Sequence, residues 1–252
     1  MIRFFKRLRF RLAKKSKFGK YLKYAVGEIV LVVLGILIAL QVNDWNERSK
    51  TEASIDNNLA VLEQNLREDQ RQLQDLQREM ITNMQAADST LMQLKTLIPV
   101  NDRIKTYLIT LIREFQFSPN TNAVETMTQS SEIPSLSPRL RTAILDYYAL
   151  IERAKEREHI SNSNIQNDFQ HYVLGQYPHI IQRDNREVFI ATYYQDDPRP
   201  VSPIDTSEFL QDARIEALTL VRYYQVVHLK ELYEGLIQSA SDILDLIEEK
   251  RN

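Results

Sequence analysis

Two patterns of apolar residues divide the first hundred positions of the chain. From Ala25 to Val42 the residues are apolar except for Glu28 near the start and Gln41 near the end. From Asn46 to Ile98, a stretch without glycine or proline, apolar residues instead recur at steps of three and four, the spacing of one helix face. The first pattern predicts a membrane span. The second predicts a long amphipathic helix that can continue directly from the span.

The predicted span has the length and flanks of a transmembrane helix. Tyr24 to Val42 is 19 residues, which cover roughly 28 Å as a helix. Tyr21, Tyr24 and Trp45 stand where aromatic rings anchor a helix at the two interfaces. A cleaved signal peptide is the competing interpretation. A long basic region and the absence of a small-residue cleavage site favour a retained anchor.

The long amphipathic helix has a coiled-coil-like pattern with two irregularities. Its apolar steps include consecutive fours at 76–80–84, a stutter, and one step of seven that skips Asp69. Asp69 is therefore polar where a core residue is expected. The same spacing suits a dimer and an intramolecular bundle, so the pattern leaves open whether another copy or the chain's own helices cover this face. Its apolar positions are Ile55, Leu59, Leu62, Leu66, Leu73, Leu76, Met80, Met84, Ala87, Leu91, Leu94 and Ile98.

Capping signals predict the helices that follow. Asn101 or Asp102 begins a helix through about Phe115, and Thr121 or Asn122 begins a short one through about Gln129. Ser137 before Pro138 begins a helix that runs towards Leu174, with a weak point at 161–164. Residues 176–205 are irregular, and a short strand at 188–193 finds no partner. Asp205 with Glu208 predicts the start of a final helix through about Glu249.

The expected fold is all-α: an N-terminal transmembrane helix, a long coiled-coil-like helix and an extracytoplasmic helical bundle. The expected divisions are a basic amphipathic segment at 1–23, the span at 24–42, the heptad-patterned helix at 43–98 and a bundle at 99–252 that packs with it.

Charge orients the chain across the membrane. Residues 1–23 carry ten basic side chains and no acidic one, whereas residues 43–252 carry 22 basic and 33 acidic ones. The positive-inside rule places the basic segment in the cytoplasm and residues 43–252 outside it. Apolar residues within 1–12 share one helical face, which favours binding to anionic lipid headgroups. Nucleic acid is the weaker alternative, because the segment is short and is tied to a span.

Composition excludes several classes of site. The chain has no cysteine, which excludes disulfides, zinc fingers, iron–sulfur clusters and thiol nucleophiles. Its five glycines do not cluster, which excludes the glycine-rich loops of nucleotide-binding sites. No motif of a hydrolase or a metalloprotease is present. We therefore expect no cofactor, no metal and no enzymatic activity.

A family resemblance rests on the residues around the span. The stretch from Tyr24 through Gln41, followed by Asn43-Asp44-Trp45-Asn46-Glu47, resembles the N-terminal signature of uncharacterised single-span membrane proteins of the Bacteroidetes. The head Ile2-Arg3-Phe4-Phe5 is similar as well. Beyond residue 47 the likeness is reduced to features such as Leu140-Arg141 before Asp146-Tyr147-Tyr148. The resemblance implies an inner-membrane anchor with a helical periplasmic part and no assigned activity.

Glu28 is the most unusual residue of the span. Glu28, Gly35 and Ala39 share one helix face, and Gly35 with Ala39 forms a small-xxx-small pair that lets helices approach closely. A carboxylate in a span faces a partner, a cavity or the interface. One interpretation is helix packing, with Glu28 reaching towards Lys20 or Lys23. The other is a proton-binding group in an ion-coupled complex.

Histidine and tyrosine provide weaker candidates. Glu156 with His159 and Asp168 with His171 have the spacing of di-iron carboxylate sites, but both pairs fall in one predicted helix, so solvated faces are expected. His179 and His228 add no motif. A ligand pocket of Tyr148, Tyr172 and Tyr224 is a further hypothesis.

Three classes of function therefore compete. The sequence favours a non-enzymatic, membrane-anchored interaction or scaffold protein that binds its own copies or another membrane protein. The alternatives are an extracytoplasmic ligand sensor that signals through a partner, and an enzyme with a metal in the bundle. A subunit of an ion-coupled complex that uses Glu28 is a further alternative.

Overall fold

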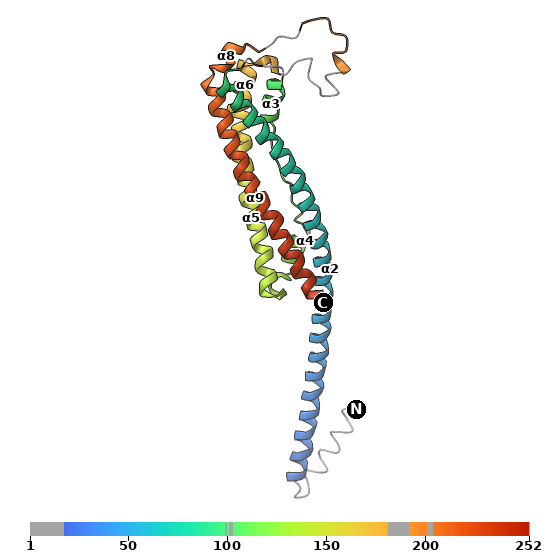
Figure 1. Ribbon diagram of the computed structural model, residues 1–252. Helices are drawn as coiled ribbons and strands as arrows, with labels where there is room; N and C mark the ends of the chain where they lie inside the picture. The colour runs from blue at the N-terminus through green and yellow to red at the C-terminus, as the bar shows by residue number, and fades with distance from the viewer. Residues whose placement is uncertain (1–17, 99, 101–102, 181–191, 201–203, 252) are drawn as a thin grey trace. The chain divides into compact units, whose positions relative to one another are not determined.

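A computed structural model describes residues 18–98, 100, 103–180, 192–200 and 204–251 (Figure 1). Most of these residues are helical and none of them forms a strand, so the predicted all-α class is confirmed. The elements are α2 (Phe18–Thr96), α3 (Arg103–Leu111), α4 (Asn122–Gln129), η1 (Ile133–Ser135), α5 (Pro138–Asn164), η2 (Ile165–Gln170), α6 (His171–Gln176), η3 (Pro178–Ile180), α8 (Thr206–Leu210) and α9 (Ala213–Arg251). The predicted amphipathic helix within 1–12 lies outside the described residues, as does most of the strand considered at 188–193.

The chain divides into two compact units, Met1–Asn57 and Asn58–Asn252. In the first unit, α2 exposes its apolar side chains from Val26 to Val42. This part of α2 is long and apolar enough to cross a membrane, with a mean hydropathy of 2.5 over its most apolar window. No residue boundary separates the predicted span from the predicted long helix, because α2 continues through both.

In the second unit, the apolar face of α2 is buried by the chain's own elements. Leu59, Leu62, Leu66, Leu73 and Met80 are at most 2% exposed. Contacts on either side of this face come from one chain: Gln70 Nε2 donates to the carbonyl of Ile237 in α9 at 3.1 Å, and Asn65 donates to Asn122 in α4 at 2.5 Å. The question that the heptad pattern left open is therefore answered within this chain. The face from Leu59 to Leu94 is an intramolecular seam, with Leu76, Met84 and Leu91 half-buried at its edge. The last predicted position, Ile98, lies beyond the end of α2 and is 59% exposed, so it is not part of the seam.

Helices α5 and α9 pack along each other and complete the bundle (Figure 1). The start of α5 is the one predicted: Ser137 Oγ accepts from the main-chain N–H of Leu140 at 3.3 Å, and Pro138 occupies the first turn. The helix does not run unbroken to Leu174. It ends at Asn164, at the predicted weak point, and continues through the π-helical turn η2 into α6.

Two helix predictions were wrong in extent. Helix α3 ends at Leu111 instead of about Phe115, because residues 113–121 are not helical and bury the side chains of Phe115 and Phe117. The final helix begins at Asp205 as predicted, with the carboxylate accepting from the N–H groups of Ser207 and Glu208. It then breaks, and α9 begins at Ala213 because Asp212 caps it by accepting from the N–H groups of Arg214 and Ile215.

Helix α4 ends in a Schellman motif that places a serine in the left-handed region. Ser131 has φ 57°, and its N–H donates to the carbonyl of Thr128 while that of Glu132 donates to Met127. Glycine is the residue usually found at this position, because a Cβ there meets the following carbonyl.

Replacing Ser131 with glycine should therefore stabilise the fold. We expect a gain of about 0.5–1 kcal/mol in the free energy of unfolding, because the strain removed exceeds the added freedom of the unfolded chain. Urea unfolding of the full chain in detergent, followed by far-UV circular dichroism, measures the change. Ser130→Gly is the matched control: Ser130 has φ −83°, so glycine there should give no gain.

Candidate functional site

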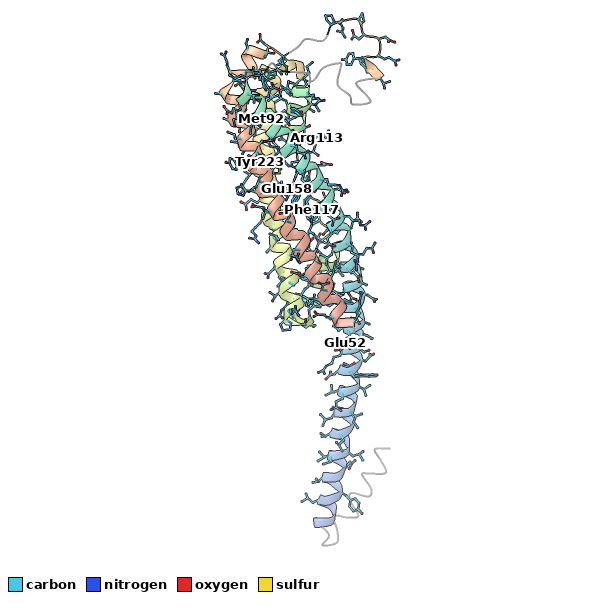
Figure 2. All side chains as sticks on the ribbon, in the orientation of Figure 1. Glu52, Met92, Arg113, Phe117, Glu158 and Tyr223 are labelled. Atoms are coloured by element: carbon cyan, nitrogen blue, oxygen red, sulfur yellow. The ribbon has the colours of Figure 1, made fainter. Side chains whose placement is uncertain are left out.

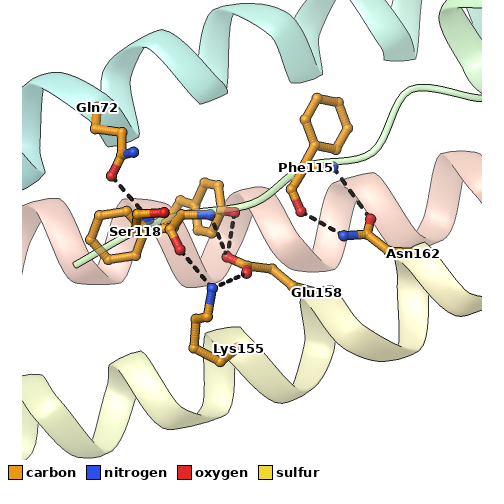
Figure 3. A network of polar contacts seen from close by, with 8 residues as sticks. Gln72, Phe115, Ser118, Lys155, Glu158 and Asn162 are labelled. Atoms are coloured by element: carbon orange, nitrogen blue, oxygen red, sulfur yellow. Dashed lines mark hydrogen bonds and ion pairs between the residues drawn. The ribbon is translucent and has the colours of Figure 1, made fainter.

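Residues 113–121, here called the clamped segment, connect α3 to α4 between α2, α5 and α9 (Figure 3). Phe115 and Phe117 are buried, whereas Gln116 and Ser118 are exposed. This alternation is that of an extended chain. Since no strand lies beside it in the described part of the chain, its main-chain groups need side-chain partners.

Helix α5 supplies most of these partners from one face. The amide of Asn162 donates to the carbonyl of Phe115 at 2.9 Å and accepts from its N–H at 3.3 Å. Glu158 Oε1 accepts from the N–H of Phe117 at 3.0 Å, and Lys155 Nζ donates to the carbonyl of Phe117 at 2.6 Å. Lys155 and Glu158 also form an ion pair at 2.8 Å. Spacings of three and four residues thus let one helix bind alternate residues of an extended chain.

Helix α2 binds the far end of the clamped segment. Gln72 accepts from the N–H of Ser118 at 3.1 Å. Asp69 Oδ1 accepts from the main-chain N–H and the side-chain amide of Asn120 at 3.0 and 2.8 Å. The hydroxyl of Tyr147 donates to Asp69 Oδ2 at 3.0 Å. Asp69, the polar residue that interrupts the heptad pattern, is therefore 1% exposed, and both of its carboxylate oxygens accept hydrogen bonds.

Burial sets the electrostatics around Asp69. It raises the pKa of this carboxyl above the ordinary 3.8, although the hydrogen bonds from Asn120 and Tyr147 act in the opposite direction. Burial likewise raises the pKa of Tyr147, with a further contribution from the Asp69 charge. The described residues place no cation on Asp69 by a hydrogen bond or an ion pair.

Glu158 is the centre of the network, at mid-height of the second unit beside Phe117 (Figure 2). It is 3% exposed, and besides the Phe117 N–H it accepts the hydroxyl of Tyr233 from α9 at 2.6 Å. The Tyr233 ring packs edge-on against Phe117, with 6.2 Å between the ring centroids. Burial raises the pKa of Tyr233, which keeps its hydroxyl a donor. One carboxylate thus joins α5, α9 and the clamped segment.

Arg222 closes the network at the end of α3. It is 1% exposed, and its guanidinium donates to Ser161 Oγ at 3.0 Å and to the carbonyl of Arg113 at 2.6 Å. It also lies 4.9 Å from the centroid of the Phe115 ring. Burial lowers the pKa of Arg222 to about 9. The cation is held by the carbonyl oxygen of Arg113 and by the face of the Phe115 ring, both of which favour positive charge.

A second polar cluster explains the break before α9. Asp212 Oδ1 caps α9, and its other oxygen accepts the hydroxyls of Tyr172, at 2.9 Å, and Tyr177. Burial raises the pKa of Tyr177. Arg214 lies over the Tyr172 ring, 4.5 Å from its centroid. Asp212 thereby fixes the position of α6 against the start of α9.

The hypothetical tyrosine pocket is not formed. Tyr148 donates to the carbonyl of Asn120 at 3.1 Å, whereas Tyr172 bonds Asp212. The two are separated by 24 residues of nearly continuous helix, roughly 36 Å. Tyr224 is 62% exposed. The three rings therefore do not line a common space.

The three histidines whose side chains the structure describes are not gathered either. His159, His171 and His228 are exposed, as are Glu156 and Asp168. Among the described residues, no group of three or more His, Asp or Glu side chains is placed to hold a metal ion.

The predicted face of the span stays a prediction. Glu28, Gly35 and Ala39 are exposed, and a Cβ added to Gly35 would meet no atom within 4 Å. Of the expected interface anchors, Tyr24 is 76% and Trp45 72% exposed, and the side chain of Tyr21 lies outside the described residues.

Glu158, Ser161 and Arg222 were missed at the level of sequence, although a signal exists. Buried residues of α5 follow steps of three and four from Leu140 through Ile144, Tyr147, Ile151 and Ala154, and the next two steps fall on Glu158 and Ser161. In α9 the same rule falls on Arg222. Like Asp69, these are polar residues at core positions.

The chain was compared with known proteins. A comparison with protein-family models matches residues 28–175 to a family described as a family of unknown function, DUF6090. The match begins inside the apolar segment and extends through the clamped segment and α5 to the end of α6, well beyond the stretch on which the resemblance was seen. Searches of curated proteins and of solved structures each give no match.

Proposed function

Because the chain belongs to the family of unknown function DUF6090, we propose a role from its architecture: a membrane-anchored, non-enzymatic helical interaction protein. One observation carries the proposal. Along α2, apolar side chains from Val26 to Val42 are exposed, whereas the apolar face from Leu59 onwards is buried. Exposure of a continuous apolar surface is stable in lipid and costly in water.

The arrangement in the membrane follows from charge. The basic segment 1–23 lies on the cytoplasmic side, where it binds anionic lipid headgroups, and residues 43–252 lie on the periplasmic side of a bacterial inner membrane. Tyr24 and Trp45 mark the two interfaces. Anchored in this way, the helical bundle acts through partners: its own copies or another membrane protein.

The polar network supports a structural rather than a chemical role for the bundle. Asp69 and Glu158, the carboxylates of the clamp, both hold main-chain groups and tyrosine hydroxyls of the same chain. They fix an extended segment in the core, and in this way keep the bundle rigid as a platform for partners.

Membrane extraction tests the anchor. We expect the wild-type chain to stay in the pellet when bacterial membranes are washed with alkaline carbonate. Leu34→Arg with Leu37→Arg should release it, because each charge at the centre of a span costs about 2.5–3.5 kcal/mol. Ile81→Arg, at an exposed position of the second unit, is the matched control and should stay in the pellet.

The orientation is read with the same preparation. The chain has no cysteine, so Ser49→Cys introduces a single thiol, which a membrane-impermeant maleimide should label from the periplasmic side of intact cells with a permeable outer membrane. A wild-type chain in the soluble fraction would refute the anchor. Labelling only after lysis would show that residue 49 lies on the cytoplasmic side and would refute the proposed orientation.

A further inference from the structure

Three buried side-chain atoms have no hydrogen-bond partner among the described residues: Nε of Arg222 in α9, and Oδ1 of Asn83 and Nε2 of Gln77 in α2. Arg222 and Asn83 are each 1% exposed, and buried polar atoms are normally paired with protein groups or with ordered water. Gln77 lies six residues before Asn83, roughly 9 Å along the helix, and offers a donor, as Arg222 does. Arg222 and Asn83 instead offer a donor and an acceptor, which one ligand can satisfy together.

Arg222 directs its remaining N–H towards the chain that follows α3. Its Nη1 donates to Ser161 Oγ at 3.0 Å, and its Nη2 donates to the carbonyl of Arg113 at 2.6 Å. The Phe115 ring covers one face of the guanidinium, whose central carbon lies 4.9 Å from the ring centroid. In the rigid fork of an arginine, Nε–H and one N–H of Nη2 point from the same edge. The acceptor for Nε–H therefore lies beside the carbonyl of Arg113.

Asn83 reaches the same turn of the chain from α2. Its Nδ2 donates to the carbonyl of Thr110 at 2.6 Å, and this bond fixes the orientation of the amide, because a carbonyl oxygen accepts from the amide nitrogen and not from its oxygen. The N–H of Arg113 donates to the same carbonyl at 3.3 Å. Thr110 and Arg113 thus belong to one hydrogen-bonded turn, with Asn83 at its first carbonyl and Arg222 at its last. The unpaired Oδ1 and Nε both adjoin this turn.

We propose that one ordered water molecule binds at this turn and bridges Arg222 Nε to Asn83 Oδ1. Water accepts from the guanidinium and donates to the amide oxygen. Its second proton has the carbonyl of Arg113 beside it, which completes the three hydrogen bonds typical of a buried water. An anion accepts from Nε–H but has no proton to donate to Oδ1, and an ammonium group has no lone pair for Nε–H and is repelled by the guanidinium. The chemistry of the two atoms therefore selects water.

The water connects α9 to α2 at the start of the clamped segment. Further along this segment α2 binds the main chain directly, through Gln72 and Asp69. With the water in place, each of the three guanidinium nitrogens of Arg222 has a partner. The site lies wholly within the second unit, so it does not depend on the proposed membrane anchor, and the two proposals can fail separately.

Nuclear magnetic resonance of the full chain in detergent, labelled with nitrogen-15, tests the site. The measurement is made at about pH 6, well below the pKa of about 9 to which burial lowers that of Arg222, so the guanidinium is protonated. A rotating-frame Overhauser experiment should give a cross-peak from water to the Arg222 Nε–H, which Arg222→Lys identifies by removing it. A second cross-peak should appear at the Nδ2 protons of Asn83. The sign of each cross-peak separates a bound water from proton exchange.

Matched variants test the bridge. Asn83→Leu should weaken the Arg222 cross-peak at least about threefold, because the water loses one of its three partners. Asn65→Leu removes another buried amide about five turns away on α2 and should leave the cross-peak unchanged. A wild-type chain without the Arg222 cross-peak overturns the proposal, as does a cross-peak at only one of the two side chains. So does a cross-peak that survives Asn83→Leu and disappears in Ser161→Ala, since it would come from the serine hydroxyl. Far-UV circular dichroism checks that each variant is folded, and if Asn83→Leu is not, the two wild-type cross-peaks decide.

Discussion

Replacing Glu158 with alanine should lower the free energy of unfolding of the bundle by about 3–5 kcal/mol, the cost of breaking a buried charged network from one side. The substitution leaves the N–H of Phe117 and the hydroxyl of Tyr233 without an acceptor, and Lys155 without its carboxylate. Each buried polar group that is left without a partner lowers the stability of the fold by the full free energy of its desolvation. Urea unfolding of the full chain in detergent measures the loss.

Two controls separate the network from a general effect of the substitution. Glu156→Ala removes an exposed carboxylate two residues away on the same helix and should change stability by less than about 0.5 kcal/mol. In a double-mutant cycle, Tyr233→Phe should cost clearly less in the Glu158→Ala background than alone, because the hydroxyl has by then lost its acceptor. Equal costs in both backgrounds would show that the two residues are not coupled.

The pH dependence of stability should identify Asp69. Because burial raises the pKa of Asp69 in the folded chain above 3.8, the folded state binds the proton more tightly than the unfolded state. Its contribution to stability is therefore full below the unfolded pKa and is lost as pH rises through the folded one. Relative to Asp69→Asn, which carries no charge, the wild-type chain should gain stability on acidification from neutral pH towards pH 4.

Replacing Asp69 with asparagine and with alanine should have different effects on the free energy of unfolding. Asp69→Asn keeps an acceptor for Asn120 and removes the buried charge, so at neutral pH it should be about as stable as wild type or more stable. Asp69→Ala leaves the Asn120 N–H and the Tyr147 hydroxyl unpaired and should cost about 2–4 kcal/mol. A wild-type chain that loses stability relative to Asp69→Asn on acidification would contradict a raised pKa.

The clamp gives these carboxylates a clear role. An extended segment inside a helical bundle has main-chain groups that no helix satisfies, and the described residues offer it no neighbouring strand. Side chains of α2, α5 and α9 take the place of that strand, with Asn162 bonding both the N–H and the C=O of Phe115. The buried charge is the cost of holding this segment in one register.

Local features of the chain were largely predictable from the sequence. The apolar run, the end of α2 near Pro99, the Ser137-Pro138 start of α5 and the Asp205 cap depend on residues that are at most a few positions apart. Hydrophobic periodicity and capping chemistry act over this range, so the pattern suffices. The all-α class follows from the same signals. The end of α3 and the break between α8 and α9, which were predicted wrongly, depend on distant partners instead. Asp212 shows this through its hydrogen bonds to Tyr172 and Tyr177.

The sequence by itself determined the apolar segment, the order of the helices and the presence of a polar residue, Asp69, in a core position. Only the tertiary structure decided which residues and which surfaces contact one another. Asp69 bonds residues 51 and 78 positions away, and the heptad face of α2 is covered by its own chain rather than by a second copy. Both outcomes depend on which surfaces pack together, and an apolar repeat specifies that a face must be buried without specifying by what.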